Sequence, residues 1–351
     1  MTFRSYAATT VLCGLIAAST AKGQAVKPLP SKVAETKTSA KSQSWKLSRT
    51  PDGQPDMQGF WTNATFTPLE RPVELGNKEF FTEAEAVAWE KERLARENSQ
   101  AKNDIHYDNT LWQTENWSRV SNRRTSMIFD PPNGRIPALS AEGQKRALIE
   151  SQNAKRKAAS EDAQSRSLAE RCIAWGNEGP PMIGSTYNAN LQIVQAAGLF
   201  SIRHEIIHGY RVVPLDGSPH LPAAIHQLGG DSRGHWEGET LVVDTTNFSD
   251  QTNFRGPPAN TRQDIFSSHD MHVTERFTRV DAETIIYRFT VEDPSTWVRP
   301  WSGELLMKRT EGPIYEYACH EGNYGLANIL AGARAAEREA AKATASKKSR
   351  E

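Results

Sequence analysis

The fold is decided by the stretches LQIVQ (191–195), LFSIRHEIIHGYRVVPL (199–215), ETLVVDTTNF (239–248), MHVTERFTRV (271–280), ETIIYRFTVED (283–293), GELLMKR (303–309) and PIYEYACHE (313–321). Each is short, alternating or β-branched, and bounded by Gly, Pro or polar turn residues, which is typical of strands. Tight connections at 236–238 and 281–283 favour consecutive antiparallel strands over βαβ units. We therefore predict a mainly β (α+β) fold, an antiparallel β-barrel or sandwich with peripheral helices.

Two helical segments precede these strands, near residues 82–100 and 141–170. The first begins with Thr82 followed by Glu85 three residues later, which is the pattern of a capping box. The second is rich in Ala, Lys, Arg, Gln and Glu. Residues 331–351 are predicted to form a charged helical tail. We assign residues 49–330 to a single β-rich domain.

The N-terminus has the order of a secretory signal peptide. Arg4 precedes a small and apolar run, and short polar residues follow it. Gly23-Gln24-Ala25 places cleavage after Ala25, with Ser19-Thr20-Ala21 as the second choice. The run is too short to span a bilayer, so no membrane insertion is expected after cleavage. Residues 26–48 are Lys, Ser, Pro and Thr-rich and are predicted to be a disordered leader. The predicted location is periplasmic or secreted.

Charge and cysteine content restrict the partners and the compartment. The formal net charge is zero, so nothing favours nucleic acid as a partner. Two cysteines remain beyond the signal peptide, Cys172 and Cys319. In an oxidising compartment an even pair favours a disulfide over free thiols. The alternative is a free, catalytic Cys319 beside His320. A disulfide would join the middle of the chain to its last predicted strand.

The pattern His204-Glu205-Ile206-Ile207-His208 matches the zinc-protease motif H-E-x-x-H. That chemistry requires a helix, on which residues four apart share one face and one metal. The flanking residues have strand composition, and on a strand residues four apart are about 13 Å distant. We therefore interpret this segment as a strand with His204 and His208 on one face and Glu205 on the other. Glu205 and His208 are candidate acid/base residues.

Residues 230–234 match G-x-S-x-G, the nucleophile elbow of the α/β hydrolases, but the required strand-turn-helix context is missing. We expect instead a tight loop in which Asp231 accepts hydrogen bonds from the turn and Arg233 reaches a carboxylate. Near the C-terminus, His320 and Glu321 follow Cys319 and would be held rigidly by its disulfide. Asp231, His320 and Glu321 therefore join the catalytic candidates.

Ligand contacts are predicted from cationic and aromatic side chains. The candidates for substrate binding are Arg123, Arg124, Arg233, Trp236, Trp297 and Trp301. The tryptophans fall at predicted strand ends or turns, where a barrel rim can stack on small apolar or carbohydrate ligands. Plugging of a barrel end is the alternative role. His269 and His272 offer two imidazoles in four residues, and with His204 and His208 they are the low-ranked metal-ligand candidates.

The chain also resembles a protein family across nearly all of its predicted mature length. The resemblance rests on TPDGQPDMQGFWTNATFTPLERP (50–72), RRTSMIFDPPNGRIPALS (123–140), GGDSRGHWEGETLVVDTTNFSD (229–250), TERFTRVDAETIIYRFTVEDPSTWVRPW (274–301) and YEYACHEGNYG (315–325). These blocks are similar to those of an abundant family of exported proteins from environmental bacteria. The resemblance implies export and one shared architecture, and it implies no particular reaction.

These observations lead to three functional hypotheses. The first is an exported soluble enzyme, a hydrolase, lyase or isomerase, that acts on a small, partly apolar molecule by cofactor-free acid/base chemistry. The second is a periplasmic small-molecule-binding protein without catalysis. The third is a metal-dependent hydrolase that uses a divalent metal in the His204/His208 region. No dinucleotide, Walker, haem or CxxC motif is present, so no cofactor is favoured. The sequence leaves the oligomeric state open.

Overall fold

In the computed structural model, the described residues are 45–98, 122–157, 162–164, 166–176, 178–184, 186–251, 253–255, 264–266 and 268–348. The predicted signal peptide and most of the predicted leader lie outside these residues. The compact unit that carries the sheet and helices begins at Ser44.

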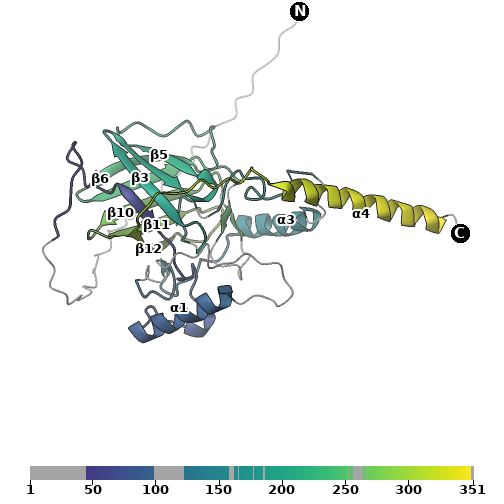
Figure 1. The fold of residues 1–351 in the computed structure, drawn as a ribbon, viewed down its shortest axis with the longest axis horizontal. Coiled ribbons are helices and arrows are strands. Elements are labelled where there is room, and N and C mark those ends of the chain that lie inside the picture. Colours follow the sequence, from purple (N-terminus) through teal and green to yellow (C-terminus); the bar gives the residue numbers. More distant parts are fainter. Residues whose placement is uncertain are drawn as a thin grey trace, which may run out of the picture. The chain divides into compact units, whose positions relative to one another are not determined.

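The protein is mainly antiparallel β (Figure 1). One large sheet has the strand order β5-β4-β3-β1-β12-β11-β10-β7-β6, and β2 pairs with β12 off this path. A separate small sheet pairs β8 with β9. The strands are β1 Gly59–Thr62, β2 Ile128–Asp130, β3 Asn190–Ala196, β4 Leu199–His204, β5 Tyr210–Pro214, β6 Asp231–Glu237, β7 Thr240–Thr246, β8 Asn253–Arg255, β9 Asp264–Phe266, β10 His272–Arg279, β11 Thr284–Glu292 and β12 Trp301–Arg309.

The large sheet curls into a nearly closed barrel because its two edge strands, β5 and β6, lie against each other. Gly234 on β6 makes this approach possible. A Cβ at Gly234 would lie 2.6 Å from Cδ2 of Leu215 and 2.9 Å from Cγ1 of Val213. The predicted barrel with peripheral helices is therefore confirmed.

Strand periodicity decides which side chains face the barrel interior. Along β10 exposure alternates strictly, and Val273, Glu275 and Phe277 are buried. The core is aromatic: the ring centroids of Phe277 and Tyr287 lie 5.0 Å apart, and those of Tyr287 and Phe289 5.7 Å apart. The alternation in the sequence therefore correctly predicted which side chains of β10 face the barrel interior and which face outward.

Within the described residues, three α-helices accompany the sheet: α1 Glu83–Asn98, α3 Ala141–Lys157 and α4 Tyr324–Lys348. The predicted capping box forms, since the backbone N–H of Thr82 donates to Oε2 of Glu85 (2.8 Å) and the N–H of Glu85 donates to Oγ1 of Thr82 (3.3 Å). None of the described helices is long and apolar enough to cross a membrane.

Three sequence-based expectations are wrong in detail. Residues 313–321 form no strand, because both neighbours of β12 along the sheet, β1 and β11, are already in place. Residues 231–234 belong to strand β6 and not to a loop; only Gly230, with φ +68°, makes the turn. The second helix is shorter than predicted, and the chain forms turns at 168–172.

Candidate functional site

The H-E-x-x-H pattern lies where β4 ends. His204 is the last residue of β4, and a single 3-10 turn, Ile206–His208, leads to β5. One such turn cannot place two imidazoles on one helical face, so the zinc-protease geometry is absent. The predicted strand across 204–208 is wrong beyond His204, because Glu205 has helical backbone angles (φ −69°, ψ −44°) and the 3-10 turn follows it. His204 and Glu205 nevertheless line two different cavities. The side chain of His208 lies outside the described residues.

The first cavity, called here the Glu178 cavity, has a volume of about 600 Å³. It lies beside the β5–β6 seam, between β4, β5, the start of β6 and the segment 173–179. Its ionisable lining residues include Glu178, His204, Tyr210, Arg211 and Asp231, and Trp175 is among its apolar ones. A cavity of this size fits a small organic molecule.

The carboxylate of Glu178 is held against the backbone of Gly209. A Cβ added at Gly209 would lie 2.2 Å from Oε2 of Glu178, so only glycine leaves room for it. The backbone N–H of Trp175 donates to Oε1 (2.9 Å). Burial raises the pKa of Glu178 from 4.5 to about 7, against the opposing effect of the Trp175 N–H. Both protonation states are therefore populated near neutral pH.

His204 also contacts Gly209, but through its backbone. The backbone N–H of His204 donates to the carbonyl of Gly209 (2.7 Å), which fixes the end of β4. Burial, with the positive charge of Arg211 as a second cause, lowers the pKa of its imidazole to about 3. The ring is therefore neutral at physiological pH. Its Nε2 atom is buried and has no hydrogen-bond partner among the described residues.

Arg211 connects this cavity to the barrel interior. Its two terminal nitrogens donate to both carboxylate oxygens of the fully buried Glu275, at 2.5 and 3.0 Å. The hydroxyl of Tyr287 also donates to Glu275 (2.7 Å) and accepts from the N–H of Met182 (2.7 Å). Because Met182 follows the segment that carries Glu178, this network anchors the cavity wall to the core.

Asp231 is held in an ion-pair chain and is not a free base. Its carboxylate accepts hydrogen bonds from the guanidinium of Arg233 (2.7 Å) and from the backbone N–H of Leu221 (2.9 Å). It also faces Nδ1 of His220 (3.0 Å). Arg233 therefore reaches a carboxylate as predicted, although on a strand, whereas Asp231 accepts from Leu221 and not from its own turn. Against the opposing effect of burial, these hydrogen bonds and the charge of Arg233 lower the pKa of Asp231.

The same chain continues across the sheet to His272. Asp244 on β7 accepts from Nε2 of His220 (2.9 Å) and contacts Nε2 of His272, whose Nδ1 lies 3.2 Å from Glu292. The hydrogen bond that His272 makes to Asp244 raises the pKa of its imidazole, against the opposing effect of burial. Both ring nitrogens of His272 face carboxylates, which favours its protonated form. His269 has a different neighbour, the ring of His226 at 4.0 Å.

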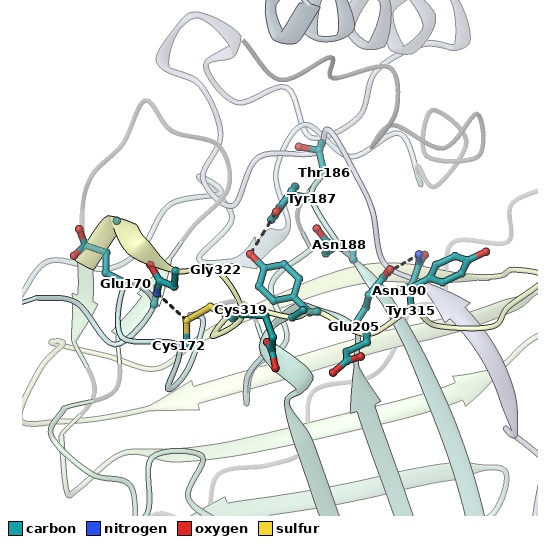
Figure 2. A pocket seen from close by; sticks show the side chains of 18 of the residues that line it. Glu170, Cys172, Thr186, Tyr187, Asn188, Asn190, Glu205, Tyr315, Cys319 and Gly322 are labelled. Carbon is teal, nitrogen blue, oxygen red and sulfur yellow. Dashed lines mark hydrogen bonds between the residues drawn. A yellow bond between two sulfur atoms is a disulfide. The ribbon is translucent and has the colours of Figure 1, made fainter. Parts of the chain in front are cut away.

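The second cavity, called here the tyrosine cavity, has a volume of about 930 Å³ (Figure 2). Glu205 and Glu321 line it together with Tyr187, Tyr315 and Tyr317. The predicted disulfide between Cys172 and Cys319 is present and forms part of its wall. The two cavities are lined by adjacent residues of the chain, since Cys172 lines this one and Ile173 lines the other.

The remaining predicted site residues lie elsewhere. Trp297 and Trp301 are 3% and 0% exposed and pack edge-to-face in the core, so they plug the barrel and form no rim. Trp236 is half-buried against the core. Arg124 is paired with Glu79 and Glu304 and is not a free anion contact. The other two, Arg123 and His320, are exposed and line neither cavity.

The low-ranked metal ligands are not brought together in a recognisable set. Among the described residues, no group of three or more His, Cys, Asp and Glu side chains has an arrangement that could hold a metal ion. His204 lines the Glu178 cavity, whereas His272 lies between Asp244 and Glu292.

Sequence reasoning missed Glu178 because Asn177-Glu178-Gly179-Pro180 resembles an ordinary polar turn. It missed His220 and Asp244 because their partners come from other strands. The one sequence feature that could have drawn attention to Glu178 is its position six residues after Cys172, which the predicted disulfide holds in place.

Comparison with known proteins identified no similar protein. The chain has no significant match to a protein-family model, a curated protein or a solved structure. The functional argument therefore rests on the residues of the two cavities.

Proposed function

We propose that this protein is an exported enzyme that acts on a small, neutral, partly apolar molecule by acid/base chemistry in the Glu178 cavity. One observation carries the proposal. The carboxylate of Glu178 packs against Gly209, His204 lines the same cavity, and the buried Nε2 of His204 has no hydrogen-bond partner among the described residues. An unsatisfied buried polar atom in a cavity is a position that a ligand group can satisfy.

The two side chains suit different roles. Glu178 would donate or accept the proton, because a general acid or base works best with a pKa near the working pH. His204 would orient the substrate, since a neutral imidazole offers one donor and one acceptor to a hydroxyl or carbonyl group. This pair needs no cofactor and suits a hydrolase, a lyase or an isomerase. Glu178 thereby replaces Glu205 and Asp231 as the main acid/base candidate.

The charges around the cavity favour a neutral substrate. The charge of Arg211 is balanced by Glu275, and that of Asp231 by Arg233. Ile173, Trp175 and Leu228 add apolar surface to the same cavity. Apart from Glu178, the acid/base candidate itself, a charged ligand would meet no unpaired counter-charge among the described lining residues. A neutral molecule with one polar end loses little solvation there.

Export is part of the proposal. It is supported by the signal-peptide pattern of residues 1–25 and by the Cys172–Cys319 disulfide, because structural disulfides are typical of oxidising compartments.

The test is a reaction screen with a matched pair of variants. Mature protein would be incubated in D2O with a panel of small neutral ketones, hydroxyketones and esters, and NMR would follow proton exchange and product formation. We expect Glu178→Gln to reduce the rate for any converted compound by about 10²–10⁴-fold. Glu239→Gln, an exposed carboxyl in the β6–β7 turn, should retain the wild-type rate. Equal rates in Glu178→Gln and wild type, or no conversion of any compound, would reject the proposal.

Gly209 allows a second test that leaves every functional group in place. Gly209 has φ −55° and ψ 133°, which alanine adopts freely, so Gly209→Ala adds only a methyl group in the space of the Glu178 carboxylate. We expect the variant to fold and to lose activity. Gly332→Ala in α4, whose Cβ would meet nothing within 4 Å, is the control.

A further inference from the structure

The tyrosine cavity differs in character from the Glu178 cavity. Its described lining includes three tyrosines, Tyr187, Tyr315 and Tyr317. The hydroxyls of Tyr187 and Tyr317 lie 3.3 Å apart, and their rings meet edge to face with centroids 6.2 Å apart. Two faces set at 85° to each other form a corner in which a compact group can contact both rings.

The charges in this cavity have one sign. Its lining includes Glu170, Glu205, Glu316 and Glu321, and no lysine or arginine is among the described lining residues. Glu170 is already paired with Arg166 outside the lining. Glu316 and Glu321 are exposed, which gives the cavity a negative mouth. Negative charge at a cavity mouth attracts cations and repels anions.

Among the glutamates that line this cavity, Glu205 would be stabilised most by a nearby cation. It is only 8% exposed, and the groups that donate to it are neutral, chiefly the side-chain amide of Asn190 (2.7 Å) and that of Asn188 (Figure 2). Burial raises its pKa, against the effect of these amides. A positive charge next to Glu205 would offset this cost, because an opposite charge nearby favours the ionised carboxyl.

We infer that the tyrosine cavity is a binding site for a small organic ammonium ion, with the cationic group between the tyrosine faces and Glu205. An ammonium group over an aromatic face is attracted by the partial negative charge on the face of the ring, and more strongly when the group is desolvated. The aromatic corner distinguishes this ligand class from a metal ion, which would favour oxygen ligands alone.

The cavity wall is held in place before any ligand arrives. The disulfide joins Cys172 to Cys319, and the side chain of Asn323 donates to Sγ of Cys172 (3.4 Å). The tyrosines lie on segments 186–190 and 313–318 beside this link. A preorganised site loses less conformational entropy on binding.

The test compares choline with its uncharged carbon isostere, 3,3-dimethylbutan-1-ol, by isothermal titration calorimetry on the oxidised mature protein. The two molecules differ in charge and hardly in shape. We expect choline to bind at least about tenfold more tightly than the neutral alcohol, which corresponds to about 1.4 kcal/mol. Equal affinity for both molecules, or binding of neither, would overturn the inference.

Variants locate the site. Tyr187→Leu removes one aromatic face at a position that is 42% exposed, so folding should be preserved, and Tyr187→Phe retains the face. We expect Leu to weaken choline binding about tenfold and Phe to change it little. Glu205→Gln should also weaken binding, whereas Glu239→Gln, with the same change in net charge outside the cavity, should not. A choline preference that survives both Tyr187→Leu and Glu205→Gln would contradict the assignment to this cavity. This inference concerns a different cavity from the acid/base proposal, so either can fail without the other.

Discussion

Replacing Glu178 by Gln should make the protein more stable at alkaline pH and leave its stability unchanged in acid. Below pH 4.5 the carboxyl is protonated in both the folded and the unfolded chain. Between pH 4.5 and about 7 the unfolded chain ionises while the folded one keeps its proton, so the free energy of unfolding falls as the pH rises. The pKa difference, 7 minus 4.5, is about 2.5, which at about 1.4 kcal/mol per pKa unit gives about 3 kcal/mol above pH 7.

Glutamine keeps the carbonyl that accepts from the Trp175 N–H and removes the ionisation, so it isolates this effect. Urea unfolding of both proteins, followed by tryptophan fluorescence with the disulfide intact, would be measured from pH 4 to pH 8.5. The difference between the two free energies cancels every other titrating group. We expect it to be near zero at pH 4 and to approach about 3 kcal/mol in favour of Glu178→Gln above pH 7. A difference that does not depend on pH, or a less stable variant at pH 8, would refute a buried carboxyl with a raised pKa.

Three further predictions concern the barrel and its disulfide. Arg211→Met should lower the free energy of unfolding by about 3–5 kcal/mol, because it leaves Glu275 charged and buried. The double variant Arg211→Met/Glu275→Leu should recover much of that loss in urea unfolding. Equal losses of stability in the single and the double variant would argue against the ion pair. Reduction of the Cys172–Cys319 bond, which closes a separation of 147 residues, should cost about 5 kcal/mol in the chain-entropy model. Unfolding midpoints that are unchanged by dithiothreitol would contradict this. Because burial lowers the pKa of His204 from 6.5 to about 3, the free energy of unfolding of the protein should fall as the pH drops from 6.5 to 3. The imidazole proton resonances of His204 should not shift between pH 5 and 8. A titration of these resonances near pH 6.5 would show that the imidazole is solvated.

Local patterns in the sequence predicted the elements well. The alternation in 271–280 depends only on which residues stand two apart, and it identified the buried face of β10. The capping box of Thr82 and Glu85 lies within one helical turn and formed as predicted. Two cysteines after a signal-peptide pattern indicated their pairing without any coordinates.

How the elements and their side chains lie relative to one another could not be predicted from local sequence patterns. Trp297 and Trp301 stand at strand ends, where the sequence suggests a rim, but the depth of a side chain depends on what closes the barrel above it. The segment 313–321 has strand composition yet joins no strand of the sheet, because strand pairing requires an unoccupied sheet edge.

The sequence by itself determined that this is an antiparallel β protein with a disulfide, and it pointed to the end of β4 as a place of interest. Only the tertiary structure decided that His204 and Glu205 face two different cavities, and that Glu178 joins the first of them. The physical reason is that secondary structure follows from near neighbours in the chain. The pKa of a carboxyl follows instead from the removal of water by atoms such as those of Gly209, which are distant in sequence and close in space.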